Sequence, residues 1–223
     1  MALVETVTSE QVQKTRDLFF KDYKEEISND QFNHEDIEAI KSNDYLVKLY
    51  ISHCNLQVER SAFIMHESLI WRKSFKVLDI KEDDFPAKLI AKDKICILQS
   101  KDNIPIFIVR VKLHFKGDGY DWKSYLVYIL EKMHNMRLES HLHPLAIIDH
   151  SGAGYSNVDI EFAKFATLCL QRYFPDLVGS VINVNAGWAM RTAYNILKPF
   201  MHERARERVK FMSTADVQSI VEL

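Results

Sequence analysis

The stretch PLAIIDHSGAGYSN, residues 144–157, decides the fold class of this chain. Residues 145–148 are all apolar, and a short apolar run that ends in turn residues is typical of a buried strand. Asp149, Ser151 and two glycines then indicate a turn, and Asn157 is suited to cap a following helix. A buried strand, a turn and a helix in this order predict one unit of a parallel sheet.

The same turn also raises two catalytic interpretations, a phosphate-binding loop and a nucleophile. A P-loop needs a lysine and a Ser or Thr directly after its second spaced glycine, and neither is present. A dinucleotide-binding loop needs three glycines, and this stretch has two. A nucleophile elbow needs glycine two residues before the serine, but Asp149 stands there before Ser151. We therefore predict a structural turn, and a hydrolase that uses Ser151 is the third of three functional hypotheses.

Strand and helix patterns continue on both sides of this turn. Upstream, ICILQ (95–99) and IPIFIVRVKLH (104–114) are β-branched runs separated by the turn-like SKDN, which predicts a hairpin. The remaining patterns predict helices near 121–140 and 157–173, a strand at 179–185, helices at 187–200 and 202–210, and a last short strand and helix. Strands separated by helices of this length need crossovers, so we expect a mixed, largely parallel sheet.

The first third of the chain predicts helices and no strand. Ser9 is the candidate cap of a first helix, and shorter helices are expected at 34–42 and 44–53. A longer helix carries an apolar stripe of Val58, Ala62, Met65, Leu69 and Phe75. No glycine precedes Gly117, so tight glycine turns are excluded and a helical bundle is favoured. The predicted fold class is α/β, with a helical N-terminal subdomain at 1–84 and a sheet domain at 85–223.

Composition excludes several classes of protein. The 223 residues are 47% hydrophobic, which suffices for a full core. A net charge of −2 provides no basic field, so we expect no nucleic-acid partner. Three widely spaced cysteines predict a reducing compartment without a disulfide framework, and the absence of a signal peptide or long apolar run predicts a cytoplasmic domain. His141 and His143 lack a third ligand of suitable spacing, so neither a metal nor a cofactor is expected.

Two ordered blocks of sequence resemble the CRAL-TRIO lipid-binding family. IIDHSGAG is followed by YFPDLVGSVINVNAGWAMRTAYNILKPFM, and members of that family carry similar aspartate-Ser-Gly, Tyr-Pro, INAPW and KPF blocks. The earlier ESLIWRKSF is similar to the end of the family's helical N-terminal module. The resemblance covers about residues 43–220. It implies a lipid carrier that is not an enzyme, with a sheet floor, flanking helices on one side, and a mobile helix that gates a cavity on the other side.

Physical chemistry independently makes residues 188–201 suitable for a gate. Met190, Ala193, Tyr194, Leu197 and Met201 share one helical face, and Pro199 interrupts the hydrogen-bond ladder. A methionine-rich helix can repack around an acyl chain, whereas the alternative is a core helix that never moves. With the resemblance, this predicts a lipid-binding set of Val109, Val111, Ala146, Ile148, Asp176, Trp188, Met190, Tyr194, Leu197, Phe200, Met201 and Arg208.

The resemblance leaves the lipid head group open. Asp176 and Arg208 occupy positions where phosphatidylinositol-transferring members carry a glutamate and a lysine, so both charge signs are kept. The alternative is an exposed ion pair or solvated helix charges. Cys54 replaces the arginine that reaches the phosphate, and Pro144 and Ala146 replace hydroxyl-bearing residues of phosphatidylcholine-binding members. Both known head-group sets are therefore incomplete.

We expect a domain that encloses a hydrophobic ligand and exchanges it at a membrane, with bound lipid and peripheral membrane contact as its partners. Burial of an acyl chain gains about 0.8 kcal/mol per CH₂ group, so partition alone holds a long chain strongly. The alternative is a recruitment module that does not shuttle lipid. The resemblance also implies a fragment of a longer protein with a further domain, a membrane anchor and a tether to the cytosolic face of the endoplasmic reticulum.

Overall fold

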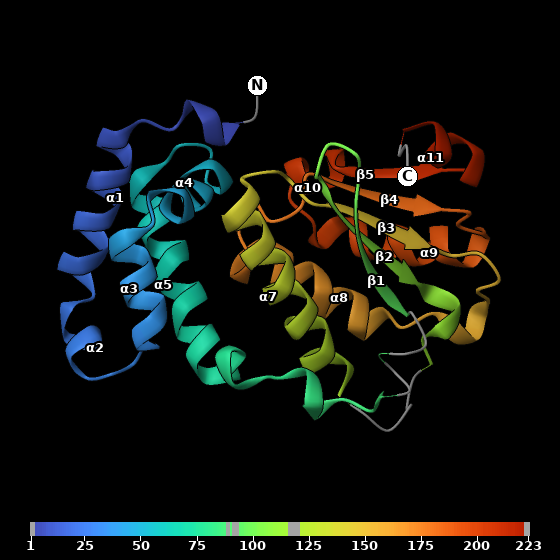
Figure 1. The fold of residues 1–223 in the computed structure, drawn as a ribbon, viewed down its shortest axis with the longest axis horizontal. Helices are drawn as coiled ribbons and strands as arrows, with labels where there is room; N and C mark the ends of the chain where they lie inside the picture. Colours follow the sequence, from blue (N-terminus) through green and yellow to red (C-terminus); the bar gives the residue numbers. More distant parts are fainter. Residues whose placement is uncertain (1–2, 88–89, 91–93, 116–120, 221–223) are drawn as a thin grey trace. The chain divides into compact units, whose positions relative to one another are not determined.

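The chain forms two compact units, which are described separately here. The structure is a computed structural model that describes residues 3–87, 90, 94–115 and 121–220 (Figure 1). The first unit contains the chain up to Ile80 together with Arg172–Asp176. The second unit contains Lys81–Gln171 and the chain from Leu177 onward.

The first unit is helical, as its sequence predicts. Its elements are η1 (Leu3–Thr6), α1 (Ser9–Asp22), α2 (Lys24–Ser28), α3 (His34–Ser42), α4 (Asp44–His53), α5 (Val58–Phe75) and η2 (Val77–Asp79). The prediction that Ser9 caps α1 is wrong, because the N-cap is the preceding residue, Thr8. Thr8 has the extended backbone of a cap, its Oγ1 accepts a hydrogen bond from the Gln11 amide (3.2 Å), and Gln11 Oε1 accepts one from the Thr8 amide (3.0 Å).

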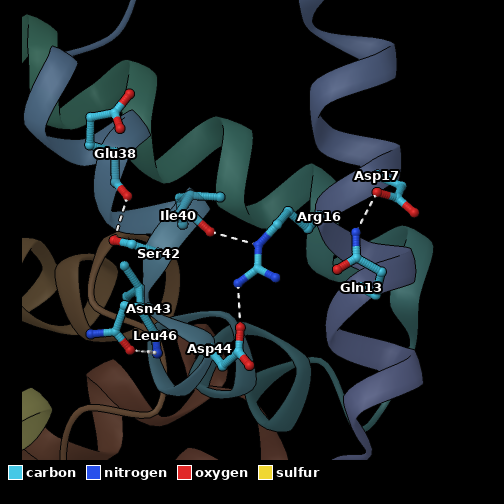
Figure 2. Close-up of polar contacts among 9 residues, drawn as sticks. All are labelled: Gln13, Arg16, Asp17, Glu38, Ile40, Ser42, Asn43, Asp44 and Leu46. Atoms are coloured by element: carbon cyan, nitrogen blue, oxygen red, sulfur yellow. Dashed lines mark hydrogen bonds and ion pairs between the residues drawn. The ribbon is translucent and has the colours of Figure 1, made fainter.

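Arg16 of α1 joins the end of α3 to the start of α4 (Figure 2). Its Nε donates to the carbonyl oxygen of Ile40 at 2.8 Å, and its Nη2 donates to Asp44 Oδ1 at 2.6 Å. Asn43 caps α4, because its Oδ1 accepts a hydrogen bond from the Leu46 amide at 3.0 Å. The short connection between α3 and α4 is therefore held on both sides by polar contacts.

The segment Arg172–Asp176 completes the core of this helical unit. The rings of Trp71 and Tyr173 stack with centroids 4.0 Å apart, and Phe174 is fully buried. Ser68 Oγ donates to the Tyr173 carbonyl oxygen (2.9 Å), and Ser52 Oγ donates to the Asp176 carboxylate (2.8 Å). The first unit thus takes part of its core from residues far along the chain.

The second unit contains a five-stranded sheet and its connecting helices. Its strands are β1 (Ile95–Gln99), β2 (Pro105–Arg110), β3 (Leu145–Asp149), β4 (Ser180–Val184) and β5 (Val209–Met212). Its helices and helical turns are η3 (Glu82–Asp84), η4 (Val111–Leu113), α7 (Trp122–Ser140), η5 (Tyr155–Asn157), α8 (Ile160–Leu168), the π-helical turn η6 (Cys169–Tyr173), α9 (Trp188–Leu197), η7 (Lys198–Phe200), α10 (Glu203–Glu207) and α11 (Thr214–Ile220).

The strands lie side by side in the order in which they occur in the sequence (Figure 1). β1 and β2 form the predicted antiparallel hairpin, and β2 to β5 are parallel neighbours. Right-handed crossovers between successive neighbours place their helices on one face of the sheet. The ring of Tyr194 in α9 meets Phe211 of β5 at a centroid distance of 5.1 Å, so Phe211 marks that face. The predicted α/β fold class is confirmed. The expected position of the gating helix on the side opposite the flanking helices is wrong, because α9 is itself part of the crossover from β4 to β5 and packs beside α8.

The strand register shows which residues of neighbouring strands point to the same face of the sheet. The side that faces the helices, called the helix-facing side below, carries Phe107, Val109, Ala146, Ile148, Val181, Asn183, Val209 and Phe211. The opposite side carries a core cluster of Ile106, Ile147, Ile182 and Val184, and Val217 of α11 packs against it. Both sides are apolar, which is typical of strands in a parallel sheet.

Three element bounds differ from the prediction. β2 ends at Arg110, and Val111 begins the 3₁₀ turn η4 instead of continuing the strand. The basic helix ends at Glu207, because Val209 and the residues after it pair with β4. Helix α8 is capped by Asp159 in place of Asn157, whose side chain instead bonds the carbonyl oxygen of His114 at 2.8 Å. The differences at Val209 and Asn157 reflect partners that are distant in sequence.

The buried ion pair of the first unit generates a stability prediction. Arg72 Nε donates to Asp36 Oδ1 at 2.9 Å, and both side chains are about nine-tenths buried or more. Replacing Arg72 by Met should lower the free energy of unfolding by about 3–5 kcal/mol, because Asp36 would become an uncompensated buried charge. The double variant Arg72→Met with Asp36→Leu should recover most of that loss. Denaturant unfolding followed by circular dichroism measures both.

Lys41→Met is the control for this prediction, because it removes an exposed pair with Glu38 and should cost little. A loss in Arg72→Met no larger than that of Lys41→Met would contradict the assigned role of the buried pair.

Candidate functional site

The turn after β3 is structural. Asp149 Oδ1 accepts a hydrogen bond from the Ser151 amide at 2.9 Å, and Gly152 has the positive φ of 71° that glycine adopts without strain. The Asn185 side-chain amide donates to Ser151 Oγ at 2.9 Å and to Thr214 Oγ1 at 2.7 Å. An amide has no basic nitrogen with which to activate a serine, so the Ser151 hydroxyl serves to hold the turn.

Apolar side chains on the helix-facing side are incompletely covered. Val109, Ile148 and Phe211 are only partly buried, although Phe107 and Ala146 on the same side are buried. Across the sheet Ile106, Ile147 and Ile182 are 1%, 6% and 3% exposed, while Ile108, Leu145 and Met212 at the margin of that cluster are partly buried. α8 has the largely apolar sequence IEFAKFATL, yet none of its residues is fully buried. Protein interiors are normally close-packed, so this side retains apolar surface that a ligand can cover.

Helix α9 is apolar on two faces. On one face Met190 is buried, and Tyr194 packs edge-on against Phe211. On the other face lies the outward stripe, defined as Trp188, Ile196 and Phe200, which are 77%, 48% and 59% exposed. Trp188 and Ile196 lie about two turns apart on α9 with the exposed Thr192 between them, and Phe200 follows in the 3₁₀ turn η7. A helix of this kind has two apolar surfaces, and only one of them is covered within the unit.

The two ends of α9 are held differently. At its start, Gly187 caps the helix without a side-chain hydrogen bond, and the preceding Asn185 has a positive φ of 53°. At its end, the buried side chain of Gln171 donates to the Phe200 carbonyl oxygen (3.0 Å) and accepts from the His202 amide (2.7 Å). Gln171 therefore clamps the end of α9 through both halves of its amide. At the start, Arg191 Nε donates to the Ala186 carbonyl oxygen at 3.0 Å, a bond made from within α9 itself.

The structure distributes the predicted site residues over several places. Val109, Ala146 and Ile148 lie on the helix-facing side, and Met190, Tyr194 and Leu197 lie on the inner face of α9. The others are outside this set. Trp188 and Phe200 belong to the outward stripe, Val111 lies in η4, and the half-buried Met201 follows η7.

The two predicted head-group residues are described in different units. Asp176 belongs to the first unit, is 2% exposed and accepts the hydrogen bond from Ser52. Arg208 belongs to the second unit and follows α10 as its C-terminal cap. Its Nη1 donates to the Val178 carbonyl oxygen at 2.8 Å. Each side chain therefore has a structural contact of its own.

Sequence reasoning missed four residues that the structure brings into this region: Gln171, Phe211, His150 and Asn183. Gln171 carries no local signal, because its partners lie about thirty residues away. Phe211 was assigned only to a short terminal strand. Asn183 does carry a signal, since it is a polar residue at an inward position of an otherwise apolar strand.

Other features of the described residues do not indicate a further binding or catalytic site. An open surface depression of about 360 Å³ is lined by Tyr194, Lys198, Glu203, Arg206 and Glu207. The cysteines are free, and burial raises the pKa of the Cys169 thiol to about 12, which leaves it unreactive. Within the described ranges no cluster of three or more His, Cys, Asp or Glu could hold a metal ion. No described helix is long and apolar enough to cross a membrane.

Comparisons with known proteins agree on one family. Residues 92–223 match the family model of the CRAL/TRIO domain. The chain is 26% identical over 117 residues to phosphatidylinositol transfer protein CSR1 of Eremothecium gossypii, covering 52% of this chain and 27% of that protein. It is 24% identical over 166 residues to human tyrosine-protein phosphatase non-receptor type 9, covering 72% of this chain and 28% of that protein.

A solved structure shows the same fold. The crystal structure of Sfh5 superimposes with a TM-score of 0.72 at 15% sequence identity, covering 95% of this chain and 82% of that one. The CRAL-TRIO domain-containing protein C3H8.02 of Schizosaccharomyces pombe is 24% identical over 133 residues, which cover 59% of this chain and 30% of that protein. The chain thus spans less than a third of the length of these curated relatives.

The Gln171 clamp generates a prediction about local opening. Gln171→Leu removes both hydrogen bonds, so amide hydrogen exchange at residues 200–202 should accelerate about five- to thirtyfold, as expected for the loss of one or two neutral hydrogen bonds. Exchange across 188–194 should change less. Lys164→Ala is the matched control, because it removes only the contact of Lys164 Nζ with the Phe200 ring at 4.8 Å. Equal exchange in Gln171→Leu and the wild type would show that the clamp does not hold this end.

Proposed function

Because the chain belongs to the CRAL/TRIO family, we propose that it is a non-enzymatic domain that encloses a lipid and exchanges it at a membrane surface. One observation carries the proposal. Apolar residues of the sheet and α8 stay partly exposed beneath α9, whose own inner face is apolar. A lipid chain would cover this surface and gain about 0.8 kcal/mol per buried CH₂. The relatives support this reading, since one of them is named a phosphatidylinositol transfer protein.

The outward stripe supports contact with a membrane. Trp188, Ile196 and Phe200 expose apolar surface to water, and Lys164 stands against the Phe200 ring. Indole rings and long basic side chains suit the boundary between head groups and acyl chains. Each lysine near an anionic surface adds about 1 kcal/mol of attraction. We therefore place the bilayer against the outer face of α9.

The unequal ends of α9 support a direction for gating. Gln171 clamps the end near Phe200 from outside the helix, whereas the side-chain bond at the start, from Arg191 Nε to the Ala186 carbonyl oxygen, comes from α9 itself and joins it only to the residue before its cap. We propose that α9 opens at its Trp188 end and pivots about the clamped residues 200–202. Trp188 is the most exposed member of the outward stripe, so the end that opens is also the end that enters the bilayer.

The second candidate function is recruitment of a larger protein to a membrane without lipid transfer. One relative is a tyrosine phosphatase, of which this chain spans 28%, so the domain occurs beside other activities. For this chain, a further domain, a membrane anchor, a cytoplasmic location and a tether to the endoplasmic reticulum are proposals of the same kind. Lipid loading separates the two functions, because a recruitment module needs no enclosed ligand.

Two aspartate substitutions on adjacent residues of α9 test the carrier function. Leu197→Asp places a carboxylate on the inner face and should abolish lipid loading, because an unpaired charge is unfavourable there. Ile196→Asp places the same charge on the outward stripe, so the domain should load lipid but bind and exchange with vesicles poorly. Native mass spectrometry of the purified protein measures loading, and a vesicle transfer assay measures exchange.

Thermal unfolding must show that both aspartate variants fold. Full loading of Leu197→Asp, or no lipid on the wild-type protein after incubation with vesicles, would contradict the carrier proposal. The second outcome would favour the recruitment function.

Arg208 is the proposed contact for an anionic head group. A cation is needed wherever a phosphate leaves water, and Arg208 is the position that the family resemblance indicates. Asp176, the acidic position that the resemblance indicates, lies in the first unit and accepts the Ser52 hydrogen bond, so it remains a separate proposal.

Arg208→Glu should reduce the loading of phosphatidylinositol at least tenfold and leave phosphatidylcholine nearly unchanged. Arg208→Gln keeps N–H donors for the Val178 carbonyl and isolates the loss of charge from the loss of that bond. Arg206→Glu is the matched control, because it reverses an exposed charge two residues away. Loading from vesicles that contain both lipids, read by native mass spectrometry, gives the ratio. An unchanged ratio in Arg208→Glu would remove Arg208 from the site.

A further inference from the structure

Asn183 is a polar residue in an apolar surface. Of the described β2–β5 residues on the helix-facing side, it alone is polar, and register places it between Ile148 of β3 and Phe211 of β5. Its side chain is half-buried. Asn is depleted in strands, and a polar group at an inward position costs free energy unless it is hydrogen-bonded. The Asn183 side chain therefore needs hydrogen-bond partners at this position.

One partner is His150, which directly follows β3. The His150 amide donates to the Val184 carbonyl oxygen at 3.0 Å, so the ladder continues and alternation places its side chain on the helix-facing side. His150 Nε2 and Asn183 Oδ1 are 2.9 Å apart. The imidazole is 9% exposed, and this burial lowers the pKa of His150, while weaker effects of Asn183 and Asp149 oppose the shift. The pair is therefore uncharged at neutral pH.

His150 forms a hydrogen bond with only one of the two polar atoms of the Asn183 side-chain amide. Oδ1 accepts the proton of Nε2, and the Asn183 Nδ2 donor has no hydrogen-bond partner in the part of the chain that the structure describes. Reversing the amide would reverse both roles and leave its oxygen available instead. In either orientation His150 holds the Asn183 side chain by one atom, and the other atom is left for a neutral hydrogen bond. A partner there would offset the cost of desolvating the amide, about 1–3 kcal/mol.

We propose that Asn183, positioned by His150, is a polar contact of the enclosed lipid on the helix-facing side, and that it selects an uncharged oxygen of that lipid, either an ester carbonyl or a hydroxyl. The inference rests on the proposed carrier function, because it needs a ligand on the helix-facing side. A phosphate does not fit this contact. It would bring a full charge against a neutral amide, whereas a desolvated phosphate needs a cation or several donors.

The proposal differs from a purely structural role for the pair. A structural pair would stabilise the carboxyl ends of β3 and β4 and would be indifferent to the chemistry of the ligand. A ligand contact instead predicts that lipids of equal size are ranked by the presence of one oxygen. The test therefore compares ligands that differ only at that oxygen and variants that differ only at Asn183.

The variants are Asn183→Val and Asn183→Thr. Val and Thr have nearly the same shape and both favour strands, but only Thr keeps a hydroxyl that donates and accepts. The double variant Asn183→Val with His150→Leu removes the imidazole that the single change leaves unpaired. Thermal unfolding of all three variants shows that the sheet is intact.

Two pairs of lipids provide the probes, each mixed in equal amounts in neutral vesicles. One pair is dioleoyl phosphatidylcholine and its dialkyl ether analogue, which lacks the ester carbonyls. The other pair is cholesterol and cholesteryl methyl ether, which cannot donate a hydrogen bond. Native mass spectrometry of the reisolated full chain gives the ratio of bound lipids in each pair, so the pairs distinguish a carbonyl from a hydroxyl.

The wild-type protein should prefer the carbonyl or hydroxyl lipid of at least one pair by roughly fivefold, the effect of one neutral hydrogen bond. Asn183→Val and the double variant should bind the two lipids of that pair equally at undiminished total loading, and Asn183→Thr should keep part of the preference. Loading with the same ratio in wild type and Asn183→Val would overturn the role of Asn183 and leave the carrier function standing. Absence of any bound lipid from the wild type would overturn both.

Discussion

Parallel strands can be joined only by crossovers, and right-handed crossovers place every connecting helix on the same face of this sheet. Strands β2 to β5 are neighbours in sequence order, so no connection reverses direction and no crossover helix reaches the other face. The two sides of the sheet are therefore covered by different parts of the chain. One side packs tightly around Ile147 and Ile182, and the other must be covered by α7, α8 and α9. Every feature of the candidate site follows from that division.

In a ligand carrier, incomplete packing on the helix-facing side leaves apolar surface for the ligand. Folding normally buries apolar side chains as completely as their shapes allow, since each gap forfeits dispersion contacts. Here the opposite side of the sheet holds a buried core cluster that includes Ile106 and Ile182. The helix-facing side is then free to exchange protein contacts for ligand contacts at little cost to the fold. Asn183 is the polar residue of this surface. Because its partner His150 is neutral, the Asn183 amide favours an uncharged oxygen of the ligand.

Helix α9 shows how one segment can serve both a ligand and a membrane. Its inner face contacts Phe211 through Tyr194, and its outward stripe exposes Trp188 to water. The balance between these faces depends on how the ends of the helix are held. Gln171 fixes one end by two hydrogen bonds to the backbone, whereas at the other end Arg191 of α9 itself bonds the Ala186 carbonyl oxygen. The asymmetry comes from Gln171, which lies outside α9 itself.

The sequence by itself determined the α/β class and the order of helices and strands, because both depend on local periodicity and turn chemistry. The buried strand before Asp149, the hairpin of β1 and β2, and the apolar inner face around Tyr194 were all predictable in this way. Only the tertiary structure decided that Asp159 caps α8, that β2 ends at Arg110 and that Val209 belongs to a strand. It likewise decided that Gln171 meets the end of α9 and that His150 meets Asn183. The contacts of Gln171 and of His150 join residues about thirty positions apart, and no local pattern encodes which of many polar side chains will meet once the sheet has formed.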